Sequence, residues 1–160
     1  MTTTFFVFLW ILFIIVVLAV ITRILVHKKY SYLFMDWEKV DMPYITIDIQ
    51  GNKFNMIVDS GASLSIIRKD AVDMLSSYEY IPRVVNLSAI TDDSVRSNVI
   101  SVPINIGDKE VKTDFVIYGG DDIAGFGSKC GVTIHGILGV EFFKKTKGKI
   151  DFNTQSVIFP

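Results

Sequence analysis

The residues best suited to chemistry in this sequence are Asp59, Ser60 and Gly61. The preceding residues, 54–58, alternate large apolar side chains as a half-buried strand does, and a second apolar stretch follows at 64–67. Gly61 allows a tight turn, and the Ser60 hydroxyl can hydrogen-bond within that turn or across an interface. A carboxylate held between two strands in this way can transfer protons. The alternative is a turn with no catalytic role.

Peptide hydrolysis by aspartates requires two facing carboxylates around one water molecule. One carboxylate acts as the base on the water, and the other is protonated and donates to the carbonyl oxygen. The sequence has one Asp-[Ser/Thr]-Gly, because Asp93-Ser94 is followed by Val95. A chain of 160 residues is also too short for two such lobes. An aspartic protease of this kind would therefore be a homodimer in which each chain supplies Asp59.

Residues 59–63 resemble the active-site loop of retropepsin-like aspartic proteases, D-[ST]-G-A-[ST]. The corresponding residues are Asp59, Ser60, Gly61, Ala62 and Ser63. The resemblance implies a homodimer, with Ser60 bonding across the twofold axis and Gly61 allowing the two loops to approach.

A second segment resembles the same family's hydrophobic-hydrophobic-Gly motif, which leads into a short helix beside the active loop. This supporting segment is Gly136, Ile137, Leu138 and Gly139. Residues 149–152 and 156–159 resemble the closing strands, so the resemblance spans roughly residues 43–160. It implies an all-β fold, a small closed barrel of the acid-protease type. Scarce helical periodicity and many turn signals, such as Gln50-Gly51-Asn52 and Gly107-Asp108, also favour an all-β domain.

The resembled family closes a hairpin, the flap, over its substrate. Strands are expected on either side of a polar turn near residue 92, and this turn lacks the glycine expected at a flap tip. The flap candidates are Ile90, Thr91, Asp92, Asp93 and Ser94.

The first residues of the chain differ sharply from the rest. No charge occurs before Arg23, and residues 5–21 are all apolar. About 20 such residues can cross a bilayer core as a helix. The absence of a basic residue before this segment favours a transmembrane helix at 5–22 over a cleaved signal peptide. Arg23, Lys28 and Lys29 follow the segment, which predicts a single-pass membrane protein with its domain on the cytoplasmic side.

The sequence therefore divides into three parts. Residues 1–29 are expected to form the anchor and its basic flank, 30–42 a juxtamembrane linker, and 43–160 the protease domain. The alternative for 30–42 is an N-terminal strand packed on the domain.

Composition argues against several other functions. A formal net charge of −1 gives no reason to expect a nucleic-acid partner. The single cysteine, Cys130, has no Cys/His cluster around it, so no metal is expected. The glycine-rich stretch within the polar loop predicted at 118–132 lacks dinucleotide-loop spacing, so no cofactor is expected. His135 is interpreted as a surface or hydrogen-bonded residue.

The combined hypothesis is a membrane-anchored, homodimeric aspartic endopeptidase. Its expected partners are a second copy of itself, a peptide or protein substrate, and a lipid bilayer through residues 5–22. The strands at 44–49 and 156–159 are candidates for the dimer interface. One alternative is a catalytically silent retropepsin-like domain for dimerisation or peptide binding. Another is a structural β-domain in which Asp59 only lies in a turn.

Overall fold

The computed structural model describes residues 2–26, 29–35, 42–88, 94–120, 122–128 and 131–160. The chain forms two compact units. One comprises Met1–Lys29 together with Pro160, and the other is Tyr30–Phe159.

The first unit contains helix α1 (Thr2–Val26). Within the described part of the chain, no helix is both long and apolar enough to cross a membrane. The structure therefore gives no support to the transmembrane helix predicted at residues 5–22.

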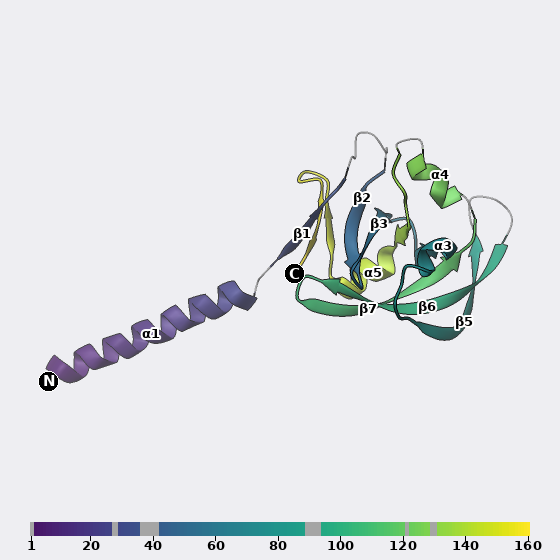
Figure 1. Ribbon diagram of the computed structural model, residues 1–160. Helices are drawn as coiled ribbons and strands as arrows, with labels where there is room; N and C mark the ends of the chain where they lie inside the picture. The colour runs from purple at the N-terminus through teal and green to yellow at the C-terminus, as the bar shows by residue number, and fades with distance from the viewer. Residues whose placement is uncertain (1, 27–28, 36–41, 89–93, 121, 129–130) are drawn as a thin grey trace. The chain divides into compact units, whose positions relative to one another are not determined.

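The second unit is built mostly from strands (Figure 1). In chain order these are β1 (Tyr30–Leu33), β2 (Tyr44–Ile49), β3 (Asn52–Val58), β4 (Ser65–Arg68), β5 (Glu79–Ser88), β6 (Ser94–Ile106), β7 (Lys109–Tyr118), β8 (Gly136–Leu138), β9 (Lys149–Asp151) and β10 (Ser156–Phe159). Three short helices interrupt them: α3 (Lys69–Val72), α4 (Asp122–Ser128) and α5 (Val140–Thr146).

These strands form two open sheets. The larger has seven strands in the order β2-β3-β8-β4-β7-β6-β5, and the smaller has three in the order β1-β10-β9. A barrel closes only when its outermost strands pair with each other. Among the described strands, β2 and β5 each have one neighbour. The predicted mostly-β fold is therefore confirmed, and the predicted closed barrel is wrong.

Both predicted hairpin turns are confirmed. Gln50 and Gly51 connect β2 to β3 with φ of 55° and 87°, the backbone that a two-residue hairpin of the common type requires. Gly107, with φ of 59°, turns β6 into β7. Glycine suits this position for two reasons. It adopts a positive φ without strain, and a Cβ there would lie 2.1 Å from the Tyr30 ring.

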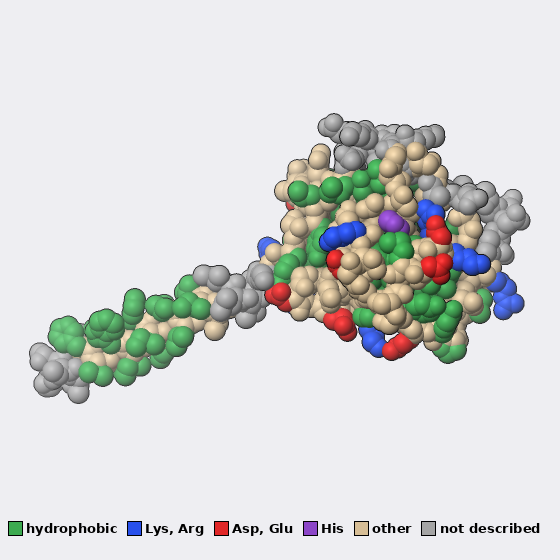
Figure 2. All heavy atoms as spheres, viewed as in Figure 1, with side chains coloured by type: hydrophobic (Ala, Val, Ile, Leu, Met, Phe, Trp, Pro, Cys, Tyr) green, Lys and Arg blue, Asp and Glu red, His purple; other side chains and the backbone are tan. Residues whose placement is uncertain are grey.

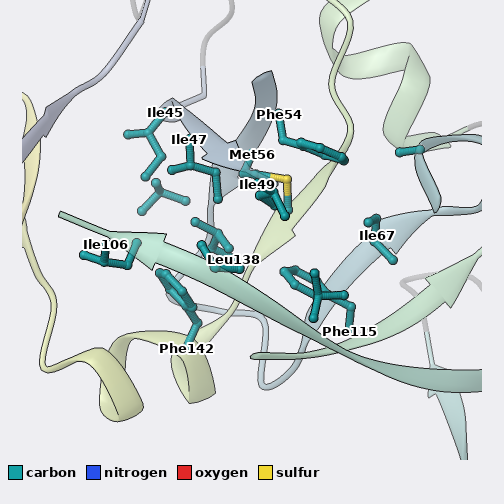
Figure 3. Packing of buried hydrophobic residues seen from close by; sticks show 14 of the residues in the cluster. Ile45, Ile47, Ile49, Phe54, Met56, Ile67, Ile106, Phe115, Leu138 and Phe142 are labelled. Carbon is teal, nitrogen blue, oxygen red and sulfur yellow. The ribbon is translucent and has the colours of Figure 1, made fainter. Parts of the chain in front are cut away.

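The main core lies between the sheets and α5. Alternate residues of β2 and β3 point into it, together with side chains from β4, β6, β7, β8 and α5. Figure 3 shows 14 of these residues and labels ten of them, among them Phe54, Phe115 and Phe142. This packing fixes β3, and with it the chain that leaves β3 at Asp59.

Strand β1 belongs to the folded domain. It pairs antiparallel with β10 from Tyr30↔Phe159 to Leu33↔Ser156, beside the yellow β9–β10 hairpin of Figure 1. Residues 30–33 thus follow the alternative of an N-terminal strand rather than a linker, while 36–41 lie outside the described residues.

The position of β10 also bears on the two strands predicted as candidates for the dimer interface. Because β1 and β9 flank β10, both edges of residues 156–159 are paired within the chain, whereas β2 lies at the edge of its sheet. The free edges of this small sheet belong to β1 and β9.

Helix α4 forms within the stretch predicted as a polar loop. Its Ile123 side chain is 4% exposed and packs with Tyr44, Ile57 and Ile134. The prediction of a loop throughout 118–132 was therefore wrong. Burial of one isoleucine on a neighbouring sheet overrides the local polar composition.

Candidate active site

The two segments singled out in the sequence lie side by side. Strand β8 lies between β3 and β4, pairing parallel with β3 and antiparallel with β4. The Val58↔Leu138 pair ends the first ladder, and the Asp59 N–H then donates to the Leu138 carbonyl at 3.1 Å. The loop of residues 59–63 therefore begins where the 136–139 segment ends.

Crowding explains the two glycines of the supporting segment. A Cβ on Gly136 would lie 2.2 Å from the Ile66 carbonyl oxygen. A Cβ on Gly139 would lie 2.5 Å from the Leu64 oxygen and 2.7 Å from the Ala62 oxygen. Any side chain at these positions would push the β8 backbone away from the loop.

The far side of the loop is held by the start of α5. The Val140 N–H donates to the Ala62 carbonyl at 2.8 Å. The Gly139 N–H donates to the Ser65 hydroxyl at 3.1 Å, and Ser65 is only 1% exposed. Sequence reasoning missed Ser65. Its signal was a hydroxyl placed between the loop and an apolar strand, where a buried polar group needs a partner.

Asp59 itself is half-buried and oriented by its own loop. Its Oδ1 accepts the Gly61 N–H at 2.7 Å, while Ser60, Gly61 and Ser63 are exposed. Among the described residues, Oδ2 has no hydrogen-bond partner and Asp59 forms no ion pair. One carboxylate is thus fixed in place with an oxygen available to a water or to a group from another molecule.

The predicted flap lies only partly within the described chain. Strands β5 and β6 form an antiparallel hairpin that extends to the pair Ser88↔Ser94, with a β-bulge between Ile81 and Val84. Ser94 is the first residue of β6. The other flap candidates, Ile90, Thr91, Asp92 and Asp93, lie outside the described residues, so the tip stays a prediction.

His135 is a hydrogen-bonded residue outside the Asp59 loop. Its Nδ1 accepts the Asn55 N–H at 2.9 Å, and its ring lies 5.3 Å from that of Phe54. Burial of the imidazole, and next the positive charge of Arg68, lower the pKa of His135 below its ordinary value of 6.5. The prediction of a hydrogen-bonded histidine is confirmed.

A second apolar cluster covers the face of β3 and β8 that points away from the main core. Its buried members are Tyr44, Ile57, Ile123 and Ile134, with Ile66 and Ile137 packed against them. The sequence carried a signal for it, because Met56-Ile57-Val58 and Ile66-Ile67 are apolar at successive positions. Such runs are typical of strands that are buried on both faces.

The described residues contain no group of three or more His, Cys, Asp or Glu side chains arranged to hold a metal ion.

Two solved structures share this architecture. A retropepsin-like aspartic protease from Rickettsia conorii superposes with a TM-score of 0.52 at 17% identity, covering 82% of this chain and 90% of that chain. The EIAV protease complexed with the inhibitor HBY-793 gives 0.51 at 17% identity, covering 75% of this chain and 100% of that chain. At these identities the likeness shows a shared retropepsin-like fold. No curated protein matches the sequence.

The family described as aspartyl protease matches the sequence over residues 45–142. This range contains both the Asp59 loop and the 136–139 segment, and it makes up more than half of the chain. The chain therefore belongs to the aspartyl protease family.

Proposed function

We propose that this protein is an aspartic endopeptidase whose active site forms from two Asp59 carboxylates, one from each chain of a homodimer. The observation that carries the proposal is the clamped loop. Asp59 follows β3, is fixed by Leu138 and Gly61, and keeps one carboxylate oxygen without a partner among the described residues. A single such carboxylate per chain is half of the required pair.

The reaction follows from that pair. The ionised carboxylate takes a proton from the bound water as the water oxygen attacks the carbonyl carbon of the substrate peptide. The protonated carboxyl donates to the carbonyl oxygen, which gives a tetrahedral diol. The C–N bond then breaks as one carboxyl gives its proton to the departing nitrogen. The other carboxylate takes the proton of one diol hydroxyl as the C=O bond of the new carboxyl group forms. The two carboxyls end with one proton between them, as they began.

The substrate class we propose is an extended segment of a peptide or protein. An extended chain can add its main-chain hydrogen bonds to exposed strand edges, while its side chains enter pockets beside them.

Placement at a membrane is a separate part of the proposal and depends on the sequence. Residues 5–22 are uncharged, and Arg23, Lys28 and Lys29 follow them. This pattern favours an anchored protein with its protease domain on the cytoplasmic side. The structure adds no support, since the described helices include none able to cross a membrane.

The proposal is tested by replacing the catalytic oxygen. In Asp59→Asn the amide oxygen can still accept the Gly61 N–H, so the loop should keep its shape while the base is lost. Peptidase activity of the full chain on a peptide library should fall by at least about 10²–10⁴-fold. Glu110→Gln removes one negative charge from an exposed carboxylate on β7 and should leave activity unchanged.

An independent readout is inhibition by a statine-type peptide, whose hydroxyl takes the place of the tetrahedral carbon's oxygen. Cleavage by Asp59→Asn at a rate close to that of the unmodified chain would show that the aspartic mechanism is wrong. A folded wild-type chain with no peptidase activity would favour the catalytically silent alternative.

A further inference from the structure

The seven-stranded sheet divides at one end, next to α3. Strands β6 and β7 pair only from Val99↔Val116 to Ile106↔Lys109. Before Val99, the described partner of β6 is β5, and beyond Val116, the described partner of β7 is β4. The two strands therefore separate, and each has an edge facing the gap.

Two adjoining cavities occupy this gap. They measure about 460 Å³ and about 430 Å³, and both are lined by Lys69, Asp73 and Gly119. The larger also has β6 and Ile117 along its walls, and the smaller reaches Gly120. We call the two together the α3–β6 groove. The strand edges beside it suit an extended chain, which can add its main-chain hydrogen bonds to them.

The charges of the groove favour an acidic ligand. Lys69 and Arg96 line the larger cavity, are exposed, and form no ion pair within the described part of the chain. Asp73 is the acid beside them, and the other acid, Asp70, is already paired with Arg68. One positive charge thus remains in excess. Figure 2 shows charged side chains of both signs gathered beside the purple histidine on the face in view.

Two tyrosines add an aromatic surface to the same wall. Tyr78 and Tyr80 line the larger cavity with their rings 5.3 Å apart in an edge-to-face arrangement. Tyr80 is 66% exposed, so its ring is accessible to a ligand in the groove. Such rings bind peptide side chains at little entropic cost and present hydroxyls that donate to carboxylates.

The groove and the catalytic loop lie at opposite ends of strand β4. Strand β4 begins at Ser65, which binds Gly139 beside the loop, and ends at Arg68 on the groove wall. These three residue steps span about 10 Å, which is also the span of three residues of an extended peptide.

We propose that the α3–β6 groove binds an acidic segment of the peptide substrate, with an Asp or Glu side chain placed three or four residues from the bond that is cut. Lys69 and Arg96 are the specificity-determining residues. The edges of β6 and β7 supply main-chain hydrogen bonds. This inference rests on the proposed function for its link to cleavage, but acidic binding in the groove can be measured without cleavage.

The test uses the full chain carrying Asp59→Asn, so that bound peptides are not cut. It is applied to an array of ten-residue peptides in which each Glu-containing sequence has a partner with Gln at the same position. The Glu peptides should bind about three- to tenfold more tightly than their Gln partners, as expected for two exposed charge pairs. Adding Lys69→Glu and Arg96→Glu should abolish or reverse this preference, whereas Lys69→Arg with Arg96→Lys should keep it.

A matched control separates the groove from general surface charge. The double variant Arg83→Glu, Lys144→Glu makes the same change of charge at two exposed positions that do not line the groove. Arg83 lies on β5, in the same hairpin as Arg96 on β6. This control should retain the preference for Glu. Equal binding of Glu and Gln peptides, or equal loss in both double variants, would overturn the inference.

Cleavage by the wild-type chain gives the second readout. Its cut sites should be enriched in Asp or Glu three or four residues away, and the enrichment should disappear in the Lys69→Glu, Arg96→Glu chain. Acid-selective binding without any cleavage would support acidic binding in the groove and contradict the proposed peptidase activity. Cleavage without acid selectivity would contradict acidic binding in the groove and support the proposed peptidase activity.

Discussion

The position of the Asp59 carboxylate is set by backbone hydrogen bonds more than by contacts with other side chains. The Asp59 N–H is held by Leu138, its Oδ1 by the Gly61 N–H, and the loop that follows by Val140 and Ser65. Residues with little chemistry of their own therefore decide where the carboxylate points, which makes them sensitive sites for substitution.

Gly139→Ala should damage the active loop through crowding. Its Cβ would lie 2.5 Å from the Leu64 oxygen, so β8 and the loop must separate. We expect a loss of about 1–3 kcal/mol in the free energy of unfolding, together with a loss of peptidase activity. Urea denaturation and a peptide assay measure both effects.

Gly125→Ala is the matched control for that substitution. A Cβ at Gly125, in α4, would meet no atom within 4 Å. Its stability should change by less than about 1 kcal/mol, and in the stabilising direction if helix propensity decides the outcome. Equal effects of the two alanines would contradict the crowding account.

His135 should make stability dependent on pH. Its pKa is lowered in the folded state by burial and then by Arg68, so the unfolded chain takes up its proton first as the pH falls. The stabilising contribution of the neutral ring is present above the unfolded value near 6.5 and is lost as the pH falls through the lowered folded value. Protonation would also remove the acceptor of the Asn55 N–H.

The measurement compares urea unfolding of wild type and His135→Asn at pH 7.5 and at pH 5. The amide oxygen of Asn can accept the same N–H but does not titrate. We expect the wild type to lose more stability between the two pH values than the variant does. If both lose the same amount, His135 is not the titrating group.

At the scale of elements, local patterns predicted some strands well and others poorly. The alternation in β2 and the two positive-φ residues Gln50 and Gly51 specify a hairpin locally, and the structure contains it. Strand β1 forms because it pairs with β10, and helix α4 packs on the second apolar cluster. Both partners are distant in sequence, so the local sequence pattern does not predict these two elements. Pairing of outer strands is equally non-local, which is why the closed barrel was predicted wrongly.

Removal of β1 should destabilise the domain although the strand directly follows the N-terminal unit in sequence. Strand β1 pairs with β10 over four positions, and the Tyr32 ring packs edge-to-face on Phe159 at 5.6 Å. A chain that begins at Met35 should lose at least about 2 kcal/mol relative to one that begins at Lys29. Thermal unfolding of the two truncated chains measures this difference. Equal melting temperatures would show that residues 30–34 are a linker.

At the scale of the whole molecule, the sequence itself contains a reporter of topology. Asn86-Leu87-Ser88 is a glycosylation sequon on β5, and Asn86 is exposed. If the domain faces the cytoplasm, as the basic residues after position 22 predict, Asn86 stays unmodified in eukaryotic cells. A mass shift on treatment with an N-glycan-removing enzyme would place the domain on the other side.

The candidate site was predictable because it consists of two short segments, each with its own local pattern, whereas the assembly of two chains was not predictable in this way. The 59–63 loop and the 136–139 segment each carry a local signature, and one β-ladder joins them. How two chains would bring their loops together depends on edges that form only after folding. Residues 156–159 show this dependence, because β10 lies between β1 and β9 and both of its edges are paired within the chain.

The central claim, a site shared by two chains, is tested most directly by mixing. Wild-type chain is combined with increasing amounts of Asp59→Asn, at concentrations where the protein is dimeric, and peptidase activity is measured per wild-type chain. If each site needs two Asp59 carboxylates, mixed dimers are inactive. Activity per wild-type chain then falls to about one half at equal amounts and about one tenth at a ninefold excess. An equal mass of an unrelated protein should have no effect. Activity per wild-type chain that stays constant throughout the titration would contradict the account.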